Sequence, residues 1–344
     1  MARNQDRVTL KDIAHAAGVG VATVDRVING RAPVTPETAA RVMSAAEDLG
    51  FHAQRLMRQR LAALAPVRKL GFILQKENKR FYRRLAEELS ASAASLTDVR
   101  ATAEISFVGS LSPDDLAQEI RRVGPKVDAL GVVAIEHPKV TDAITGFSEG
   151  IPVFSLLSPI SSVGAEGYIG IDGRKAGRTA GWAMARLVPK NANVGLLIGS
   201  HRYLGHEALE AGFRGYMREI APSVTVRDSV VYLDDREVAY EAASELIAGA
   251  RDLKGIYHAG GGTSGVVRAL EESGRTHEIV YVCHELGPET ALGLQDGTVD
   301  FVLETPVKEI AVVATRAMAA ALRQGRAASP PGHVAFRLFT PENL

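Results

Sequence analysis

The chain has 344 residues, of which 46 % are hydrophobic and 23 % are charged, and its formal net charge is zero. This length exceeds one compact core and predicts two or three globular domains. Zero net charge excludes a strong overall attraction to nucleic acid or to a membrane surface. The single cysteine, Cys283, excludes an intrachain disulfide framework.

The start of the chain, "MARNQDRVTL", lacks the apolar stretch of a signal peptide. No apolar run reaches the roughly 18 residues of a membrane span. We therefore expect a cytoplasmic protein without a membrane partner.

Basic residues are concentrated near the amino terminus. Up to Arg68 there are ten Arg and Lys residues against six Asp and Glu, and residues 51–69 hold five basic residues and no acid. This pattern is typical of a segment with a local anionic partner and equally of a solvated linker. The segment "FHAQRLMRQRLAALAP" has few apolar residues, so as a helix it needs a partner surface to become ordered.

Residues 9–50 predict three short helices. The first begins at "TLKD", which has the spacing of a capping box, and ends at Gly18. The second begins after Gly20 and ends in "NG", and the third runs from "VTPET" to Leu49. Two short helices joined by a glycine-containing turn predict a helix-turn-helix.

The second helix of such a motif places its first residues in the DNA major groove. Arg26 is suited to a guanine through paired bonds to O6 and N7, and Val21 and Ala22 are suited to thymine methyl groups. Thr9 and Thr23 are suited to phosphate contacts at helix amino termini. The alternative is a three-helix bundle that binds protein.

From residue 69 onward, short apolar runs alternate with amphipathic helical stretches. The runs are 69–74, 103–109, 129–136, 151–158, 193–200, 255–260, 279–285 and 300–305. This alternation predicts parallel sheets covered by helices on both faces, divided into two doubly wound halves.

Ligands of two-domain α/β proteins bind where the carboxyl ends of the strands face the cleft. Polar residues at the predicted strand ends suit a polyhydroxylated ligand, and Phe81 and Tyr82 are placed to stack on a sugar face. Five of the nine histidines fall at these ends: His137, His201, His206, His258 and His284. The alternative is that such residues only satisfy backbone and solvent. The predicted ligand residues are Phe81, Tyr82, Glu136, His137, Ser158, Arg174, Arg202, Tyr203, His206, His258, His284, Glu285 and Glu304.

The strand ends do not match the common catalytic or cofactor patterns. "AGGGTSG" follows a strand and precedes a helix, but it lacks the Lys of a phosphate-binding loop, so it predicts cleft lining rather than nucleotide binding. The His and Glu residues at these strand ends come from separate strands and have no metal-motif spacing on one helix, and no "GxSxG" is present. We expect no cofactor, no metal and no enzymatic activity.

The stretch "VTLKDIAHAAGVGVATVDRVINGRAPVTPETAARVMSAAEDLGF" resembles the DNA-binding headpiece of the LacI/GalR family of bacterial transcription regulators. The rest of the chain is similar to the sugar-binding core of that family and of periplasmic sugar-binding proteins. The resemblance implies an all-α headpiece followed by an α/β core, made of two doubly wound parallel-sheet subdomains of the type I periplasmic-binding-protein kind. It also implies a homodimer on a near-palindromic operator, bent by a hinge helix and controlled by a small molecule.

These implications give domain bounds of 1–50 for the headpiece, 51–67 for the hinge and 68–344 for the core. The DNA-binding residues would be Thr9, Leu10, Gly20, Val21, Ala22, Thr23, Arg26, Asn29, Arg58, Arg60 and Leu61.

The chain departs from the family pattern in its DNA-binding part. Gly20 stands where Ser is usual; glycine caps a helix nearly as well, but one phosphate contact is lost. Asp25 stands where Ser is common, beside Arg26. Arg60 stands where a Leu enters the central base step, so either Leu61 takes that role or Arg60 enters the minor groove as a cation.

The core departs from the pattern as well. Leu209 replaces an Arg that clamps sugar hydroxyls, and the pair at 284–285 replaces an Asp. The effector is therefore expected to differ from a standard hexose bound in the standard way, and a modified sugar, a polyol or a sugar acid all fit. Arg174, Arg202 or Tyr203 would supply the missing contact. The predicted function is a ligand-responsive repressor; the alternative is a sugar carrier or a sugar-processing enzyme.

Overall fold

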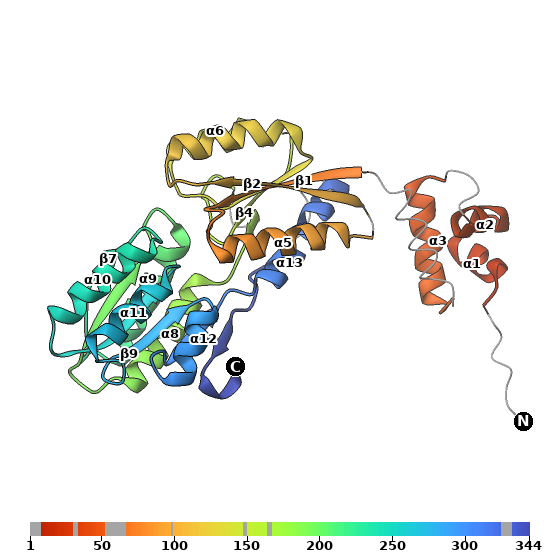
Figure 1. Ribbon diagram of the computed structural model, residues 1–344. Coiled ribbons are helices and arrows are strands. Elements are labelled where there is room, and N and C mark those ends of the chain that lie inside the picture. The colour runs from red at the N-terminus through yellow and green to blue at the C-terminus, as the bar shows by residue number, and fades with distance from the viewer. Residues whose placement is uncertain are drawn as a thin grey trace, which may run out of the picture.

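The computed structural model describes residues 8–29, 34–51, 67–97, 99–146, 150–163, 167–324 and 332–344. Three short helices form the headpiece, and two α/β lobes form the core (Figure 1). The predicted contact residues Arg58, Arg60 and Leu61 lie outside the described part of the chain.

The headpiece contains α1 (Leu10–Ala17), α2 (Val21–Asn29) and α3 (Pro36–Asp48). The predicted capping box is present, since Asp12 accepts from the Thr9 backbone N–H at 2.8 Å while its own N–H donates to the Thr9 hydroxyl at 3.4 Å. Gly18 ends α1 with φ 63°, a left-handed conformation that glycine adopts at low cost. The helices enclose a small core of Ile13, Ala14, Ala17, Val24, Val27, Ile28, Ala39, Val42, Ala45, Ala46 and Phe51.

The first core lobe, which we call the N lobe, holds a parallel sheet of order β2-β1-β3-β4-β5. Its strands are β1 (Val67–Gln75), β2 (Arg100–Val108), β3 (Ala129–Val132), β4 (Val153–Leu156) and β5 (Tyr168–Ile169). The helices α5 (Arg80–Ala94), α6 (Pro113–Val123) and α7 (Pro138–Thr145) follow the strands, and a 3₁₀ turn covers Gly124–Lys126. In Figure 1, α5 and α6 lie on opposite faces of this sheet.

The second lobe, the C lobe, holds a sheet of order β11-β10-β9-β8-β6-β7. Its parallel strands are β6 (Asn193–Ile198), β7 (Thr225–Val231), β8 (Leu253–Ala259), β9 (Val280–His284) and β10 (Phe301–Glu304), and β11 (Arg337–Phe339) pairs antiparallel with β10. The covering helices are α8 (Gly173–Leu187), α9 (Leu204–Ile220), α10 (Arg236–Ala248), α11 (Thr263–Ser273) and α12 (Pro288–Asp296). The chain closes with a 3₁₀ turn at Pro341–Asn343.

The chain crosses between the lobes more than once. After β10 it returns to the N lobe as α13 (Val307–Gln324), where Ile310, Ala311 and Ala314 join the N-lobe core. Thr315 of α13 and Ser92 of α5 are joined by a buried hydrogen bond of 2.7 Å. Strand β11 then lies back in the C lobe. In Figure 1 the blue helix α13 accordingly lies beside the orange helix α5.

All eight predicted apolar runs contain strands of the two sheets, so the predicted fold class is confirmed. Three strands were not predicted. Strands β5 and β11 are only two and three residues long, and β7 is an edge strand whose side chains are mostly exposed. An edge strand without a fully buried face carries little hydrophobic periodicity.

Candidate DNA-binding and effector sites

Helix α2 presents a polar and small-residue face to solvent. Its apolar side, with Val24 and Val27, is completely buried against α1 and α3, whereas Val21 is 42 % exposed and Ala22 and Arg26 are exposed. Thr23 is half-buried. The fold therefore displays Arg26 on the same side of α2 as the first exposed residues of that helix, the arrangement that a base-reading helix requires.

Gly20 is the N-cap of α2, since its carbonyl oxygen accepts from Thr23 N at 2.8 Å and from Val24 N at 3.2 Å. At the other end of the helix, the Asn29 side-chain amide donates to the Asp25 carboxylate at 2.5 Å. Because Asp25 and Asn29 are four residues apart, this bond spans one helical turn on the side next to Arg26. It fixes the orientation of a predicted contact residue, Asn29. Leu10 is half-buried at the start of α1.

A cavity of about 290 Å³ lies between the two lobes. The N lobe contributes Leu157, Tyr168 and seven residues from the end of β1 and the segment after it, namely Gln75, Lys76, Lys79, Arg80, Phe81, Tyr82 and Arg84. The C lobe contributes residues after β6, β7, β8, β9 and β10, among them His206, Asp234 and Thr305. The cavity thus lies at the carboxyl ends of the parallel strands of both sheets, the place where α/β proteins bind ligands.

Six of the predicted ligand residues line this cavity: Phe81, Tyr82, Tyr203, His206, His284 and Glu285. Phe81 and Tyr82 meet edge to face, with ring centroids 5.3 Å apart. The other predicted residues lie outside the cavity lining: Glu136, His137, Ser158, Arg174, Arg202, His258 and Glu304. Most of those seven residues form hydrogen bonds or ion pairs elsewhere in the fold.

Several of these residues support the backbone instead. His137 caps α7 by accepting from Lys139 N, and Glu136 accepts from Ser161 N at 2.9 Å. His258 is fully buried and its Nδ1 lies 2.8 Å from the Tyr281 hydroxyl.

Charged side chains outside the lining have other surroundings. Arg174 and Arg202 are exposed. His201 pairs with Glu210 at 2.8 Å, and Glu304 lies 3.7 Å from Arg84 and from Arg337.

Hydrogen bonds join the two lobes on either side of the cavity. The Lys76 ammonium donates to the Leu233 carbonyl oxygen at 2.7 Å, and Gly205 N donates to the Ser158 hydroxyl at 3.1 Å. The backbone of Glu136 in the N lobe also donates to the Arg202 carbonyl oxygen at 2.8 Å. These bonds stabilise one arrangement of the lobes, so an effector that contacts both lobes acts on the same equilibrium.

Backbone strain is concentrated around this cavity. Lys76, Leu157, Asp234 and Glu285 line it with φ values of 37°, 64°, 50° and 69°, in the left-handed region that side chains other than glycine seldom adopt. Such strain persists where the surrounding structure holds it, and it is found preferentially at ligand sites.

Burial controls the protonation of the cavity residues. It raises the pKa of Glu285 to about 8, so this carboxyl group is protonated at neutral pH and can donate a hydrogen bond. Burial also lowers the pKa of His284 to about 3, which keeps the imidazole neutral. The pKa of Tyr203 is raised by burial, so its phenol stays protonated. The C-lobe wall therefore offers neutral donors and acceptors.

Sequence reasoning missed several lining residues, namely Lys76, Lys79, Arg80, Arg84 and Asp234. The basic residues belong to "KENKRFYRR", directly after a predicted strand, so their position was available as a signal. From this stretch, only Phe81 and Tyr82 were predicted to contact the ligand. Asp234 follows β7, a strand that the hydrophobic pattern did not reveal. The Asp234 carboxylate accepts from Gly261 N at 3.0 Å.

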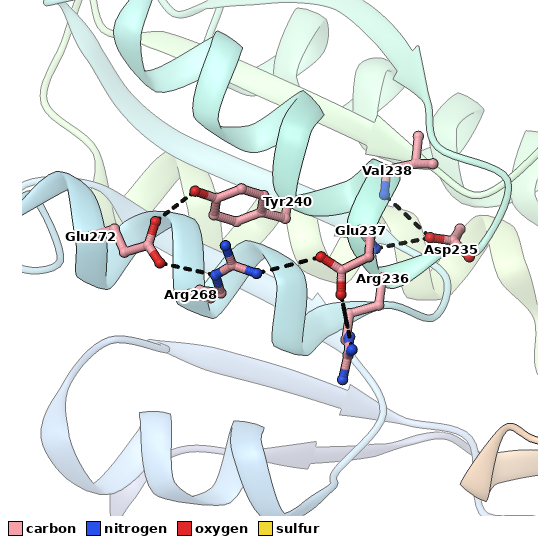
Figure 2. A network of polar contacts seen from close by, with 7 residues as sticks. All are labelled: Asp235, Arg236, Glu237, Val238, Tyr240, Arg268 and Glu272. Carbon is pink, nitrogen blue, oxygen red and sulfur yellow. Dashed lines mark hydrogen bonds and ion pairs between the residues drawn. The ribbon is translucent and has the colours of Figure 1, made fainter.

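The segment after Asp234 is held firmly in place. The neighbouring carboxylate of Asp235 caps α10 by accepting from the N–H groups of Glu237 at 2.9 Å and Val238 at 3.3 Å (Figure 2). Farther along, Arg268 of α11 binds Glu237 and Glu272 and lies 3.8 Å from the centre of the Tyr240 ring. This network links α10 to α11 outside the cavity.

The described ranges contain no metal cluster and no membrane-spanning helix. In those ranges no group of three or more His, Cys, Asp or Glu side chains is placed to hold a metal ion. No helix there is long and apolar enough to cross a bilayer.

The described chain thus combines a three-helix headpiece with a two-lobed α/β core and an interlobe cavity. The model of the bacterial regulatory proteins of the lacI family matches residues 9–54, and that of the periplasmic binding protein domain matches residues 108–327. The chain belongs to the periplasmic binding protein domain family, and its headpiece matches the model of the lacI family of bacterial regulatory proteins.

Two known proteins are similar in sequence to parts of this chain. The chain is 36 % identical over 75 residues to the transcriptional regulator MalR of Streptococcus pneumoniae, a stretch that covers 22 % of each protein. It is 25 % identical over 249 residues to catabolite control protein A of Priestia megaterium, covering 70 % of this chain and 69 % of that protein. The stretch matched to MalR thus spans about a fifth of the length of that relative. MalR is named a transcriptional regulator, and the Priestia protein is named a catabolite control protein.

Solved structures show the fold of the core. The chain is similar to GanP, a glucose-galactose binding protein from Geobacillus stearothermophilus, with a TM-score of 0.72 and 20 % identity over 80 % of this chain and 99 % of that one. It is also similar to the arabinose binding protein AraP of the same organism, with a TM-score of 0.66 and 19 % identity over 81 % and 98 % of the two chains.

Proposed function

We propose that this protein is a cytoplasmic repressor that binds operator DNA as a homodimer. Its affinity for the operator falls or rises when a small polyhydroxylated effector binds in the interlobe cavity. The headpiece is residues 1–50, the hinge 51–67 and the effector-binding and dimerisation core 68–344. The observation that carries the proposal is the exposed Arg26 on α2, displayed by a fully buried apolar face on the opposite side.

Each part of the proposal has a physical reason. One small headpiece binds DNA weakly, and joining two of them raises the effective concentration of the second. Two-fold symmetry of a dimer matches the symmetry of a near-palindromic site. The effector acts through its differential affinity for two arrangements of the lobes, one of which is stabilised by the hydrogen bonds that Lys76 and Gly205 make between the lobes.

The test is a selection of genomic fragments by the full chain, followed by a mobility-shift assay on the recovered site. We expect Arg26→Ala to weaken binding by about 1–3 kcal/mol and to relax base preference at one position of each half-site. Arg26→Lys serves as the matched control, because it keeps the charge but loses the two-pronged contact with guanine. It should retain the salt dependence and lose the base preference. Unchanged affinity in both variants would remove Arg26 from the interface.

A carrier or a sugar-processing enzyme remains the competing function. Both would bind a sugar in the cavity without any DNA site, so failure of the full chain to retain any fragment at low ionic strength favours them. Turnover of a bound sugar separates the enzyme from the carrier.

A further inference from the structure

The interlobe cavity has one strongly cationic wall. Lys76, Lys79, Arg80 and Arg84 all line it, and all four come from the short segment 76–84, which leads from β1 into α5. The segment holds a single acid, Glu77, which is exposed and does not line the cavity. The N lobe therefore presents a concentrated positive charge to any bound molecule.

The opposite wall does not neutralise this charge. Asp234, Glu285 and Glu289 line it, but the Glu285 carboxyl group is protonated at neutral pH because burial raises its pKa. Asp234 is engaged by Gly261 N at 3.0 Å, and Glu289 is exposed. Four cations thus face two carboxylates.

The four cations differ in how far they are already satisfied. Lys76 donates to the Leu233 carbonyl oxygen, and Arg84 lies 3.7 Å from Glu304. The backbone N–H of Val238 is the main cause of the lowered pKa of Asp235, and the charge of Lys79 adds to it. Arg80 forms no ion pair with any residue in the described part of the chain. Arg80 is consequently the cation most available to a ligand.

Backbone groups add partial positive charge on both walls of the cavity. Helices α5, α9 and α11 all begin at the cavity, with N-cap residues Lys79, Tyr203 and Gly262 in its lining. None of these three N-caps makes a side-chain hydrogen bond to its helix. The first N–H groups of a helix carry partial positive charge and favour anions.

We infer that the effector is a polyhydroxylated molecule of monosaccharide size that carries a carboxylate or phosphate group, held by Arg80 and Lys79. A volume of about 290 Å³ is at the small end of ligand pockets, which limits the ligand to this size. Tyr82, Tyr203 and His284 supply neutral hydrogen-bonding groups for hydroxyls, while the cations take the acid group. This inference rests on the proposed effector role of the cavity and names the class of effector.

Isothermal titration of the full chain tests the inference with matched neutral and acidic sugars. The probes are D-glucose, D-glucuronate and D-glucose 6-phosphate, with D-galactose and D-galacturonate as a second series. We expect at least one acidic sugar to bind about 10-fold or more tightly than its neutral parent. The glucuronate and phosphate arms distinguish the two kinds of anion.

Two variants locate the anion. Arg80→Gln, and separately Lys79→Gln, should remove most of the preference for the acidic sugar. Arg83→Gln is the matched control, because Arg83 is an exposed arginine of the same helix that does not line the cavity. Neutral sugars that bind as tightly as acidic ones, or no binding of any acidic sugar, would overturn the inference. So would an equal loss of preference in Arg80→Gln and Arg83→Gln.

A parallel mobility-shift assay separates this inference from the proposed function. A neutral sugar that alters DNA binding while acidic sugars do not would overturn only the anionic class. Failure of the chain to retain any DNA fragment, with acidic sugars still bound through Arg80, would overturn only the regulatory role.

Discussion

The hydroxyl group of Tyr257 lies 2.9 Å from Nε2 of His284, and Tyr257 is fully buried. Nε2 of His284 is the hydrogen-bond partner that the described structure gives to the Tyr257 hydroxyl. A buried hydroxyl has to donate its proton, so His284 Nε2 is the acceptor and Nδ1 carries the hydrogen. Since His284 lines the cavity, Tyr257 determines which nitrogen is a donor for the effector.

Tyr257→Phe tests this relationship. The change leaves a buried imidazole nitrogen without its partner, so we expect a loss of about 1–3 kcal/mol in the free energy of unfolding. Effector affinity should also fall, because the histidine tautomer is no longer fixed. Urea unfolding and calorimetric titration measure the two effects.

Tyr281→Phe is the matched control. Tyr281 makes the equivalent bond to His258 at 2.8 Å, but His258 lies outside the cavity lining. We expect a similar loss of stability with unchanged effector affinity. An equal drop in affinity for both variants would show that Tyr257 acts through general stability and not through His284.

The raised pKa of Glu285 predicts that the free energy of unfolding falls as the pH rises toward 8. Its pKa is raised to about 8 in the folded protein, against about 4.3 for an unperturbed glutamate. Between these values the unfolded chain loses a proton that the folded chain keeps, so this group makes folding less favourable as pH rises from about 4.3 to 8. We expect Glu285→Gln to increase stability at pH 8.5 and to change little at pH 4.5, as measured by urea unfolding.

The buried histidines act in the opposite direction at lower pH. Burial lowers the pKa of His258 to about 4 and that of His284 to about 3. The unfolded chain therefore binds protons that the folded chain does not, and the folded protein becomes less stable as pH falls below about 6.5. The wild type and Glu285→Gln should share this acidic limb. A variant that is less stable than the wild type at pH 8.5 would contradict the assigned protonation of Glu285.

Gly212 allows α8 and α9 to approach closely. A Cβ atom at Gly212 would overlap the carbonyl oxygen of Arg174, and both groups belong to rigid helices. We therefore expect Gly212→Ala to lower the free energy of unfolding by about 1–3 kcal/mol or more, because backbone has to move. Thermal and urea unfolding of the full chain measure this change.

Gly215→Ala is the control on the same helix. A Cβ at Gly215 would meet no atom nearer than 3.9 Å, so the substitution should raise stability by about 0.5–1 kcal/mol through helix propensity alone. If both alanines had the same effect, close helix packing would not explain the glycine at 212.

Gly20 offers a gain in DNA binding. A Cβ there would meet nothing within 4 Å, and Gly20 already accepts the first bonds of α2. Gly20→Ser should therefore keep the fold, add a side-chain cap worth a few tenths of a kcal/mol and supply a hydroxyl for a phosphate. Mobility shift should show tighter binding, with Gly20→Ala as a control that adds bulk but no hydroxyl. Weaker binding of the serine variant would argue against a phosphate next to this position.

Local signals in the sequence were sufficient for the headpiece. The capping box of Thr9 and Asp12, the glycine at 18 and the apolar spacing of α2 all act within a few residues, so they define helices α1 and α2 without tertiary information. The same holds for most of the eight predicted strands, because strands that are buried on both faces form continuous apolar runs, whereas the edge strand β2 is only half-buried.

The sequence by itself thus determined the helix-turn-helix, the exposed Arg26 and the two parallel sheets. Only the tertiary structure decided which strand-end residues share one cavity. His258 and His284 both lie near strand ends, yet neighbouring strands bury the first between Tyr232 and Tyr281 and leave the second on the cavity wall. The return of α13 to the N lobe and the gathering of Lys79 and Arg80 opposite Asp234 also depend on how the two lobes face each other. Such contacts join residues more than a hundred positions apart, and no local pattern records them.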